Sequence, residues 1–349
     1  MLKNLTLQNF RSYKKKSFEF NKGINLIMGQ NGAGKTNILE AIYLLSNGKS
    51  FRTSNFENLI NLDSDFGRIK AETINLENEN LLEINFIKNN GINRNSKKYF
   101  LNGVSRFLKN FINNFPVVIF KPDDINIITG TPSVRRNFLD SALVSDTSYF
   151  QAKTIYDKAL KQRNALLEQI QKTGKRNQEL FEYWDNILIK NGRIITQFRS
   201  EFIAFINASK KNVFDIKVEY DKSEISKERL LQYQSAEIGM GNTLVGPQRD
   251  NLKILGKLKN AFKEMNNFGS NGQNRMSVMQ LITLQFEYIK NKTNQNPILL
   301  LDDIFSELDL QNTKLIIEKT KADQTIITST QKEIESINQS YFSKILNLD

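Results

Sequence analysis

Hydrophobic residues are spaced along the chain in a way that predicts buried strands toward both ends. Apolar runs at residues 24–28 ("INLIM"), 298–301 ("ILLL") and 324–330 ("QTIITST") have the length and β-branched content of strands buried in a parallel sheet. Polar or glycine-rich stretches follow each run, as expected where a strand ends. The pattern therefore predicts an α/β fold whose sheet collects strands from distant parts of the sequence.

The middle of the chain shows helical periodicity instead. Residues 152–171 and about 177–209 predict two long helices joined near residues 172–175. The second helix carries one apolar stripe, which we interpret as the core of a helical lobe: Phe181, Trp184, Leu188, Ile195, Phe198, Phe202 and Phe205. We accordingly expect residues 1–110 and 225–349 to form one domain, with residues 111–224 as the lobe between them.

Composition limits the possible functions. The chain has 349 residues, of which 39% are hydrophobic and 25% charged, and no apolar run approaches the ~20 residues needed to span a bilayer. The N-terminal stretch lacks a signal-peptide core, so a cytoplasmic protein is expected. With no cysteine and no histidine, disulfides, thiolate zinc sites and imidazole-based catalysis are excluded. Any metal would be a hard cation bound by oxygen.

The net charge of +12 is concentrated in the first third of the chain. Residues 1–110 carry 17 Lys and Arg against 9 Asp and Glu. Three of these lysines are expected in a turn between strands at residues 5–7 and 18–20, where they form either a solvated hairpin tip or a DNA-facing edge: Lys14, Lys15 and Lys16. This distribution favours a nucleic-acid partner, with an ordinary solvated surface as the alternative.

Residues 29–36 ("GQNGAGKT") match the P-loop pattern G-x-x-x-x-G-K-[ST] in full. The loop follows the strand at 24–28 and precedes a helical pattern, "NILEAIYLL", in the required order. In such a loop, glycines let backbone N–H groups surround the phosphates, Lys35 reaches the β- and γ-phosphates, and the Thr36 hydroxyl binds Mg²⁺. The sequence therefore predicts an ATP site.

Two acidic residues end the strand that Pro297 opens. Asp302 is placed to hold Mg²⁺, and Asp303 to orient or deprotonate an attacking water. A second candidate segment, "FGSNGQNRMS" at 268–277, leads into a helix with Val278, Ile282, Phe286 and Ile289 on one face. Helix N-termini suit phosphate, although an ordinary helix cap is the simpler interpretation.

At this point the sequence resembles ABC-type ATPases of the SMC class, whose signature loop is Ser-x-Gly-Gln at a helix start. Ser270, Gly272 and Gln273 match that loop, while Asn271 replaces its usual glycine. Further segments resemble bacterial recombination mediators of the RecF family, in the same order and across nearly the whole chain: "NFRSY" at 9–13, the block at 29–52, "FKPDDINIITGTPSVRRNFLD" at 120–140, "VGPQRDNL" at 245–252 and "LLLDDIFSELD" at 299–309.

The resemblance implies an ABC-type ATPase head, built on a P-loop sheet and an antiparallel β subdomain, beside a compact helical arm. It also implies roles for individual residues. Lys35, Ser270 and Asp303 would act in catalysis, Thr36 and Asp302 would bind the metal, and Ser306, Leu308 and Asp309 would form the D-loop. The implied nucleotide contacts are Arg11, Gly29, Gln30, Asn31, Gly32, Ala33, Gly34, Lys35, Thr36, Asn37, Ser270, Gly272 and Gln273.

Three departures from the family pattern concern the chemistry. Gln248 replaces the usual histidine of "VGPQRD", the strand at 324–330 is followed by no histidine, and residues 121–124 lack the expected Q-loop glutamine. Asp303 also stands where most relatives have glutamate. A shorter acid without a histidine sensor suggests slow ATP hydrolysis.

In this family the signature of one subunit contacts the γ-phosphate on another, so the resemblance implies an ATP-dependent homodimer. It further implies binding to double-stranded DNA and its junctions with single strands, and work with RecO and RecR to load RecA during recombinational repair, the DNA-damage (SOS) response and replication-fork maintenance. A transporter ATPase subunit is the rival reading, disfavoured by the long segment between Lys35 and Gly272; a nucleotide-gated clamp without turnover is another. Arg135 and Arg136 would contact DNA or the partner subunit, or would pair with Asp140.

Overall fold

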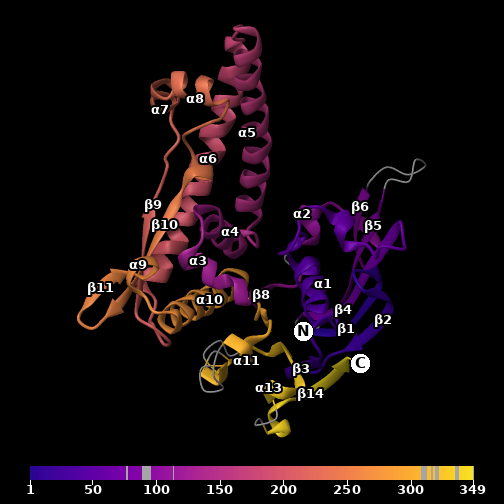
Figure 1. Ribbon diagram of the computed structural model, residues 1–349. Helices are drawn as coiled ribbons and strands as arrows, with labels where there is room; N and C mark the ends of the chain where they lie inside the picture. Colours follow the sequence, from indigo (N-terminus) through magenta and orange to yellow (C-terminus); the bar gives the residue numbers. More distant parts are fainter. Residues whose placement is uncertain are drawn as a thin grey trace. The chain divides into compact units, whose positions relative to one another are not determined.

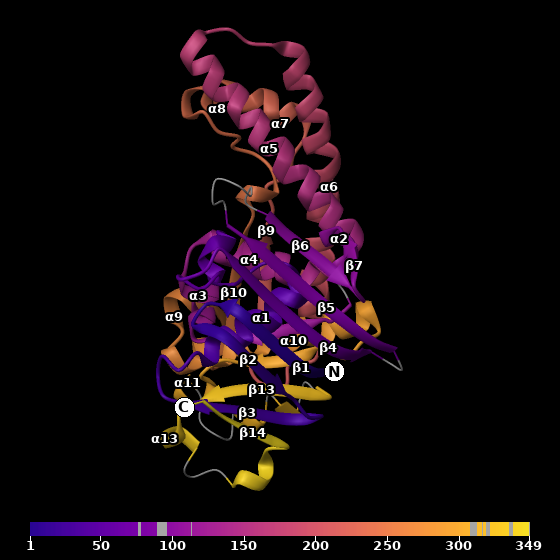
Figure 2. The ribbon, with the colours of Figure 1, turned by 90° about the vertical axis from the view of Figure 1, so that its right-hand side faces the viewer.

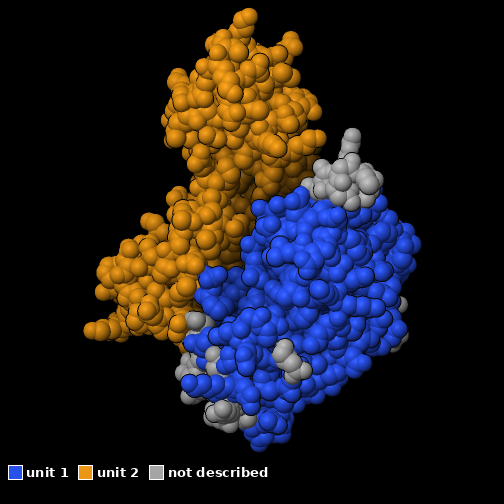
Figure 3. Space-filling model, turned by 45° about the vertical axis from the view of Figure 1, so that its right-hand side comes forward, with its two compact units in different colours: residues 1–124, 279–349 blue, residues 125–278 orange. Residues whose placement is uncertain are grey.

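The chain forms two compact units in the computed structural model, which describes residues 1–75, 78–88, 96–112, 114–307, 313–315, 317–318, 322–334 and 338–348. One unit comprises residues 1–124 and 279–349, and the other comprises residues 125–278 (Figure 3). These two units divide the chain after residues 124 and 278, whereas the domain boundaries expected from the sequence fall after residues 110 and 224. That division remains a prediction about which segments make up the ATPase head.

A five-stranded parallel sheet organises the first unit (Figures 1 and 2). Its strands occur in the order β14 (Lys344–Leu348), β3 (Gly23–Gly29), β13 (Gln324–Ser329), β12 (Ile298–Leu301) and β8 (Val117–Phe120). Every residue of β8, β12 and β13 is buried. This explains the continuous apolar runs of β8 and β12, whereas β13 buries polar residues on both sides of Ile326 and Ile327. The three predicted strands are thereby confirmed. Because all the pairs are parallel, β3 and β12 end at the same edge.

An antiparallel sheet of six strands forms the rest of the unit's β structure. Its order is β2 (Tyr13–Glu19), β1 (Leu2–Phe10), β4 (Phe66–Asn75), β5 (Asn78–Ile87), β6 (Ser96–Leu101) and β7 (Val104–Arg106). The expected place of Lys14, Lys15 and Lys16 in a turn is wrong: they lie in β2, exposed at the sheet edge, where Lys16 is opposite Leu7. The chain reverses earlier, at Arg11, which has a positive φ of 52°. Lysines at an edge strand also discourage edge-to-edge pairing.

Helix α1 (Lys35–Asn47) lies between these two sheets and contacts strands of both. It begins after Gly34 and ends at Gly48, which has a φ of 68° and donates its N–H to Leu44 O at 2.8 Å. Ten of its 13 residues are buried, so the helix packs against both sheets. This position fixes the P-loop, from which α1 starts, against the parallel sheet.

Apart from helix α10 (Asn271–Thr293), whose residues from 279 onward belong to this unit, the remaining described elements of the first unit are short. They are η1 (Phe56–Leu59), α2 (Leu108–Phe111), η2 (Pro122–Ile125), α11 (Ile304–Glu307), α13 (Gln331–Ile334) and η4 (Gln339–Tyr341). Among the described residues, none of the helices has the length and apolar character that crossing a membrane requires.

Two long helices dominate the second unit, and α5 (Thr147–Thr173) packs along α6 (Gln178–Ala208) as predicted (Figure 1). Phe181, Leu188, Ile195 and Phe202 of the expected stripe are fully buried. A three-stranded antiparallel sheet accompanies the helices, and the other elements are short: β9 (Ile216–Asp221), β10 (Asn251–Leu258), β11 (Ala261–Glu264), α3 (Asn126–Thr129), α4 (Pro132–Leu143), α7 (Lys227–Gln232), α8 (Gln234–Met240), η3 (Pro247–Arg249) and α9 (Met265–Phe268).

A buried ionic cluster joins α6 to α4 and to the start of β10. Arg199 is 1% exposed and donates to Asp250 Oδ2 at 2.7 Å, to Asp140 Oδ1 at 2.6 Å and to Pro247 O at 2.7 Å. Burial raises the pKa of Asp250, even though Arg199 and the Tyr220 hydroxyl favour its charged form. The "GPQRD" segment is thus part of the core of this unit.

Arg135 and Arg136 contribute to the same region through hydrogen bonds. Arg135 Nε donates to Asn251 Oδ1 at 2.8 Å, and Arg136 donates to the backbone oxygen of Asp250 at 3.0 Å. The alternative of an ion pair with Asp140 is not found within the described part of the chain, where Arg199 and Lys153 pair with that carboxylate. A contact of the two arginines with DNA stays a prediction.

Candidate functional site

The P-loop occupies the turn between β3 and α1. Gly32 and Gly34 have φ values of 86° and 97°, in the left-handed region that glycine adopts most easily. A Cβ on Gly34 would also lie 2.7 Å from the Tyr13 hydroxyl, so this position lacks room for a side chain. The glycines therefore shape a tight loop whose backbone N–H groups can surround an anion.

Lys35 lies inside this loop rather than in solvent. Its side chain is almost fully buried, and Nζ donates to Gly29 O at 2.8 Å and to Gln30 O at 3.1 Å. These carbonyls hold the ammonium group at the centre of the loop. A phosphate bound there would meet a positive charge that is already in position.

Asp302 and Asp303 follow β12, at the edge where β3 leads into the loop. Asp302 Oδ1 accepts the Thr36 hydroxyl at 3.1 Å and the Thr328 hydroxyl at 2.7 Å. Burial raises the pKa of Asp302, an effect that the two hydroxyls and the more distant Lys121 oppose. A buried carboxylate beside a hydroxyl is a hard-oxygen donor set, so Thr36 and Asp302 fit Mg²⁺.

Thr328 was not identified from the sequence as a site residue. Its hydroxyl also accepts the N–H of Asp303 at 2.9 Å, so one side chain positions both acids. The signal for it is topological: Thr328 lies in β13, which neighbours β12 in the sheet. Asp303 has a φ of 45°, an uncommon conformation for a non-glycine residue. The Ser306 hydroxyl donates a hydrogen bond to the backbone oxygen of Asp303 at 2.7 Å. Leu308 and Asp309 lie outside the described residues.

Arg11, expected near the nucleotide, is held beside the P-loop helix by Glu40. The guanidinium donates to both carboxylate oxygens, at 2.9 and 2.7 Å, and to Asn58 O at 2.7 Å. Glu40 is completely buried and also accepts the Ser50 hydroxyl, while Arg52 lies 3.5 Å away. Sequence reasoning missed Glu40, although an acid inside an otherwise apolar helical stripe was a usable signal.

Two further hydrogen bonds connect this network to Asn37, another expected nucleotide contact. Asn37 donates to the Ser12 hydroxyl at 3.0 Å and accepts from Arg52 at 2.9 Å. At the expected Q-loop position, Lys121 pairs with Asp124 at 2.5 Å, and burial raises the pKa of that carboxyl. Residues 121–124 are therefore tied to one another.

The serine of the expected signature caps helix α10 (Asn271–Thr293). The N–H of Gln273 donates to the Ser270 hydroxyl at 3.3 Å, and the N–H of Ser270 donates to Gln273 Oε1 at 2.9 Å. This reciprocal pair is a capping box. A Cβ on Gly272 would have no neighbour within 4 Å in the described part of the chain. The simpler interpretation, a helix cap, is thus correct as far as it goes, and a signature role for the loop stays a prediction.

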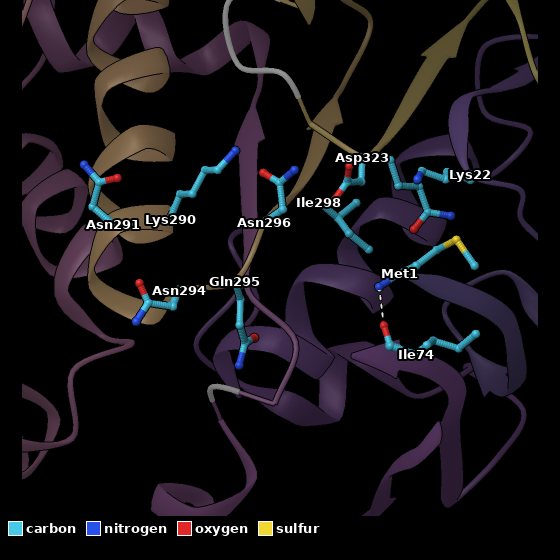
Figure 4. A pocket seen from close by; sticks show the side chains of 11 residues that line it. Met1, Lys22, Ile74, Lys290, Asn291, Asn294, Gln295, Asn296, Ile298 and Asp323 are labelled. Atoms are coloured by element: carbon cyan, nitrogen blue, oxygen red, sulfur yellow. Dashed lines mark hydrogen bonds between the residues drawn. The ribbon is translucent and has the colours of Figure 1, made fainter. Parts of the chain in front are cut away.

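The structure brings together most of the predicted site residues of the first unit. Residues 29–37, Asp302, Asp303 and Arg11 lie at one edge of the parallel sheet or beside α1, whereas Ser270, Gly272 and Gln273 gather at the start of α10 in the second unit. A cavity of about 770 Å³ opens at the opposite edge of the sheet, among Lys22, Lys290, Asn296 and Asp323 (Figure 4). That cavity is not part of the P-loop site.

Comparison with known proteins agrees with this geometry. The family model described as "RecF/RecN/SMC N terminal domain" matches residues 1–345. The DNA replication and repair proteins RecF of Bacillus thuringiensis (strain Al Hakam) and Bacillus cereus (strain B4264) are each 34% identical to the chain, covering 94% of it and 92% of the relative. A solved structure of the recombination mediator protein RecF-ATP in the RecFOR pathway is 32% identical, with a TM-score of 0.84 and coverage of 95% of this chain and 92% of that one.

The parallel sheet, the P-loop and the accompanying antiparallel sheet define an ABC-type ATPase head of the SMC class, and an SMC head bound to the C-winged helix domain of ScpA has the same fold with a TM-score of 0.53. A second solved RecF, described as RecF-ATPrS, is similar with a TM-score of 0.85 and 31% identity. The chain belongs to the RecF family.

Proposed function

We propose that the chain is an ATP-dependent DNA-binding protein of recombinational repair and replication-fork maintenance. The observation that carries this proposal is the convergence of Lys35, Thr36 and Asp302 at the end of β12, with Thr328 holding the acid in place. The RecF name of its relatives, and the ATP in the name of a similar structure, support the same conclusion.

ATP would lie in the P-loop, with Lys35 against the β- and γ-phosphates. Thr36 and Asp302 would hold Mg²⁺, which supplies electrostatic stabilisation of the transferring phosphoryl group when bound. Asp303 would orient or deprotonate the attacking water. Because an aspartate reaches less far than a glutamate and no histidine follows β13, we expect slow, DNA-dependent hydrolysis.

Two chains would enclose the nucleotide. Ser270 of one subunit, together with Gly272 and Gln273 at the positive end of α10, would contact the γ-phosphate held by Lys35 of the other. ATP would thus drive dimerisation, and its hydrolysis would separate the subunits and release DNA.

DNA would bind through the basic N-terminal part of the chain. Residues 1–110 carry most of the excess positive charge, and β2 exposes three consecutive lysines. We expect double-stranded DNA and its junctions with single strands to be preferred. The RecFOR name of the similar structures supports RecO and RecR as partners, and through them the loading of RecA in the cytoplasm.

The test is sedimentation of the Ser270→Arg variant with ATP, with ADP and without nucleotide, each with and without duplex DNA. An arginine at this position would block the facing γ-phosphate contact while leaving the P-loop intact. We expect ATP affinity within about twofold of the wild type, but a monomer in every condition. Ser226→Arg is the matched control, since Ser226 caps another helix, α7. An ATP-dependent dimer of Ser270→Arg would refute the trans contact.

Phosphate release distinguishes an ATPase from a clamp without turnover. Lys35→Arg should lessen ATP-driven dimerisation and phosphate release together, because the longer planar head group cannot replace the ammonium within the loop. Release that DNA leaves unchanged, at the background rate, would favour the clamp.

A further inference from the structure

A cavity lined by basic side chains lies beside the C-terminal end of α1. Residues 48–54 of the loop that follows the helix enclose, together with strand β6, a pocket of about 520 Å³. Its lining combines three cationic side chains with three hydroxyls: Lys49, Arg52, Lys97, Ser50, Thr53 and Ser54. None of these residues contacts the P-loop lysine, and nothing in the proposed nucleotide chemistry uses Lys49 or Lys97.

Lys97 lines this pocket from strand β6. Its ammonium nitrogen lies 5.3 Å from the centre of the Tyr99 ring and 5.7 Å from that of Phe86, and it donates to Gly48 O at 2.5 Å. The charged end of Lys97 therefore lies at the pocket, next to two aromatic rings. Burial lowers the pKa of Lys97 to about 8, and repulsion from Lys49 contributes to that shift.

Two of the three cations that line the pocket, Lys49 and Lys97, have no acidic partner among the described residues, whereas Arg52 pairs with Glu40. No carboxylate lines it among the described residues, and Lys49 forms no ion pair there. The buried Glu40, which accepts the Ser50 hydroxyl, already pairs with Arg11 and Arg52. Lys97 is partly buried and donates only to a backbone carbonyl, and a partly buried charge is normally paired, so an external anion bound with the help of the exposed Lys49 would complete the site.

We infer that this pocket is a phosphate-binding site, in which Lys97 and Lys49 hold a phosphodiester of a DNA backbone. The inference rests on the proposed DNA role of the chain and assigns it a specific contact. A phosphodiester fits better than a carboxylate-rich peptide, because it offers a single compact anion with several acceptor oxygens to two ammonium groups and the neighbouring hydroxyls.

The contact has a distinctive dependence on pH. Lys97 is charged below its pKa of about 8 and loses its proton above it, so phosphate affinity should be full at pH 7 and should fall as the pH rises. Among the described residues, the other charged or titratable groups on this face are Lys49 and Arg52 of the loop, Tyr99 of β6, Arg106 of β7, which lies opposite Tyr99, and Lys88, two residues after Phe86, the residue that pairs with Lys97. Burial raises the pKa of Tyr99, so it stays neutral over this range.

The experiment measures duplex DNA binding by the full chain, with ATP present, for the wild type and for Lys97→Met. Methionine keeps the apolar stem against Phe86 and Tyr99 and removes only the charge. We expect binding to weaken roughly five- to tenfold at pH 7, and the salt dependence to lose about one phosphate contact. Wild-type affinity should fall by up to about tenfold between pH 7 and pH 9, and the variant should lack this component.

Two further variants make the result specific. Lys98→Gln is the matched control, because Lys98 is exposed on the opposite face of the same strand, and it should keep the wild-type pH profile. Lys49→Gln should weaken binding and move the pH midpoint upward, since it removes the repulsion that lowers the pKa of Lys97. This variant also tests the site if Lys97→Met does not fold, as judged by its melting curve.

Calorimetry with sodium pyrophosphate identifies the source of the phosphate. The P-loop is first saturated with ADP, so that only a second site can respond. Heat that is present in the wild type and absent in Lys97→Met, without any effect of that variant on DNA binding, would assign the pocket to a free anion and overturn the inference. Salt-sensitive DNA binding that is identical in wild type and Lys97→Met would also overturn it while sparing the proposed function, whereas a wild type that binds no DNA would refute the function itself.

Discussion

Replacing Arg199 should lower the free energy of unfolding of the second unit far more than replacing an exposed lysine does. In Arg199→Met the side-chain volume is largely kept, but Asp250 and Asp140 lose the cation that lies between them. Asp250 is then left buried beside the Tyr220 hydroxyl, which cannot neutralise its charge, whereas Asp140 is partly exposed and keeps Lys153 at 3.6 Å.

The size of the effect follows from burial and geometry. Arg199 makes three short hydrogen bonds from an interior position, two of them to carboxylates. Breaking one partner of such a buried pair typically costs about 3–5 kcal/mol. Lys153→Met is the matched control, because Lys153 lies 3.6 Å from the same Asp140 but is partly exposed, and pairs of that kind contribute about 1 kcal/mol or less.

The fluorescence of a single tryptophan can follow the unfolding of the second unit. Trp184 is the single tryptophan and lies in α6, so its fluorescence during urea denaturation reports the unit that contains Arg199. The loss in Arg199→Met should shrink as the pH falls toward 5. Burial already raises the pKa of Asp250 above that of the unfolded chain, and without Arg199 the pKa rises further, so protonation stabilises the folded variant as the pH is lowered.

A loss below about 1 kcal/mol at pH 7, equal to that of Lys153→Met, would refute the reasoning. It would mean that water or a rearranged side chain replaces Arg199 at little cost. The double variant Arg199→Met/Asp250→Asn provides an independent check, because removing one stranded charge should recover part of the lost stability.

Two other changes test the nucleotide site. Asp303→Asn should leave ATP binding within about twofold of the wild type but reduce phosphate release at least tenfold, so that the ATP-bound dimer persists in sedimentation; unchanged release would exclude Asp303 as the residue that positions water. Glu40→Gln should lower the free energy of unfolding by about 1.5–3 kcal/mol, because it weakens charge-assisted hydrogen bonds to Arg11 and Arg52, and should also weaken ATP binding as Arg11 loses its fixed position. Calorimetry with ATP measures the second effect, and unaltered affinity would show that Arg11 does not act at the nucleotide.

The strands that carry the site could be predicted because their sequence signals are local. The centre of β3 and all of β12 are buried on both faces, so both read as short apolar runs, and Pro297 and Gly29 mark where two strands begin or end. Strand β13 could be predicted from Ile326 and Ile327 at its centre. The glycine and lysine spacing of the P-loop is equally local. Those features need no knowledge of what lies next to them in space.

Features that depend on distant partners were not predictable in this way. Arg199 lies between Phe198 and Ser200 with no sign that Asp140 and Asp250, 59 and 51 residues away, would bind it. Thr328 became a site residue only because β13 pairs with β12. Lys14, Lys15 and Lys16 were assigned to a turn because polarity suggests loops, whereas the reversal depends on the backbone conformation of Arg11.

The reciprocal hydrogen bonds between Ser270 and Gln273 have a consequence for how the start of α10 can be studied. Each residue supports the helix on its own account, so a defect caused by altering either one mixes damaged folding with lost recognition. Gly272 differs, because its φ is not in the left-handed region and a methyl group there would touch none of the residues that the structure describes. Gly272→Ala should therefore leave the stability of the fold unchanged. Any binding that this substitution weakens would involve a molecule that contacts the start of α10 from outside the chain.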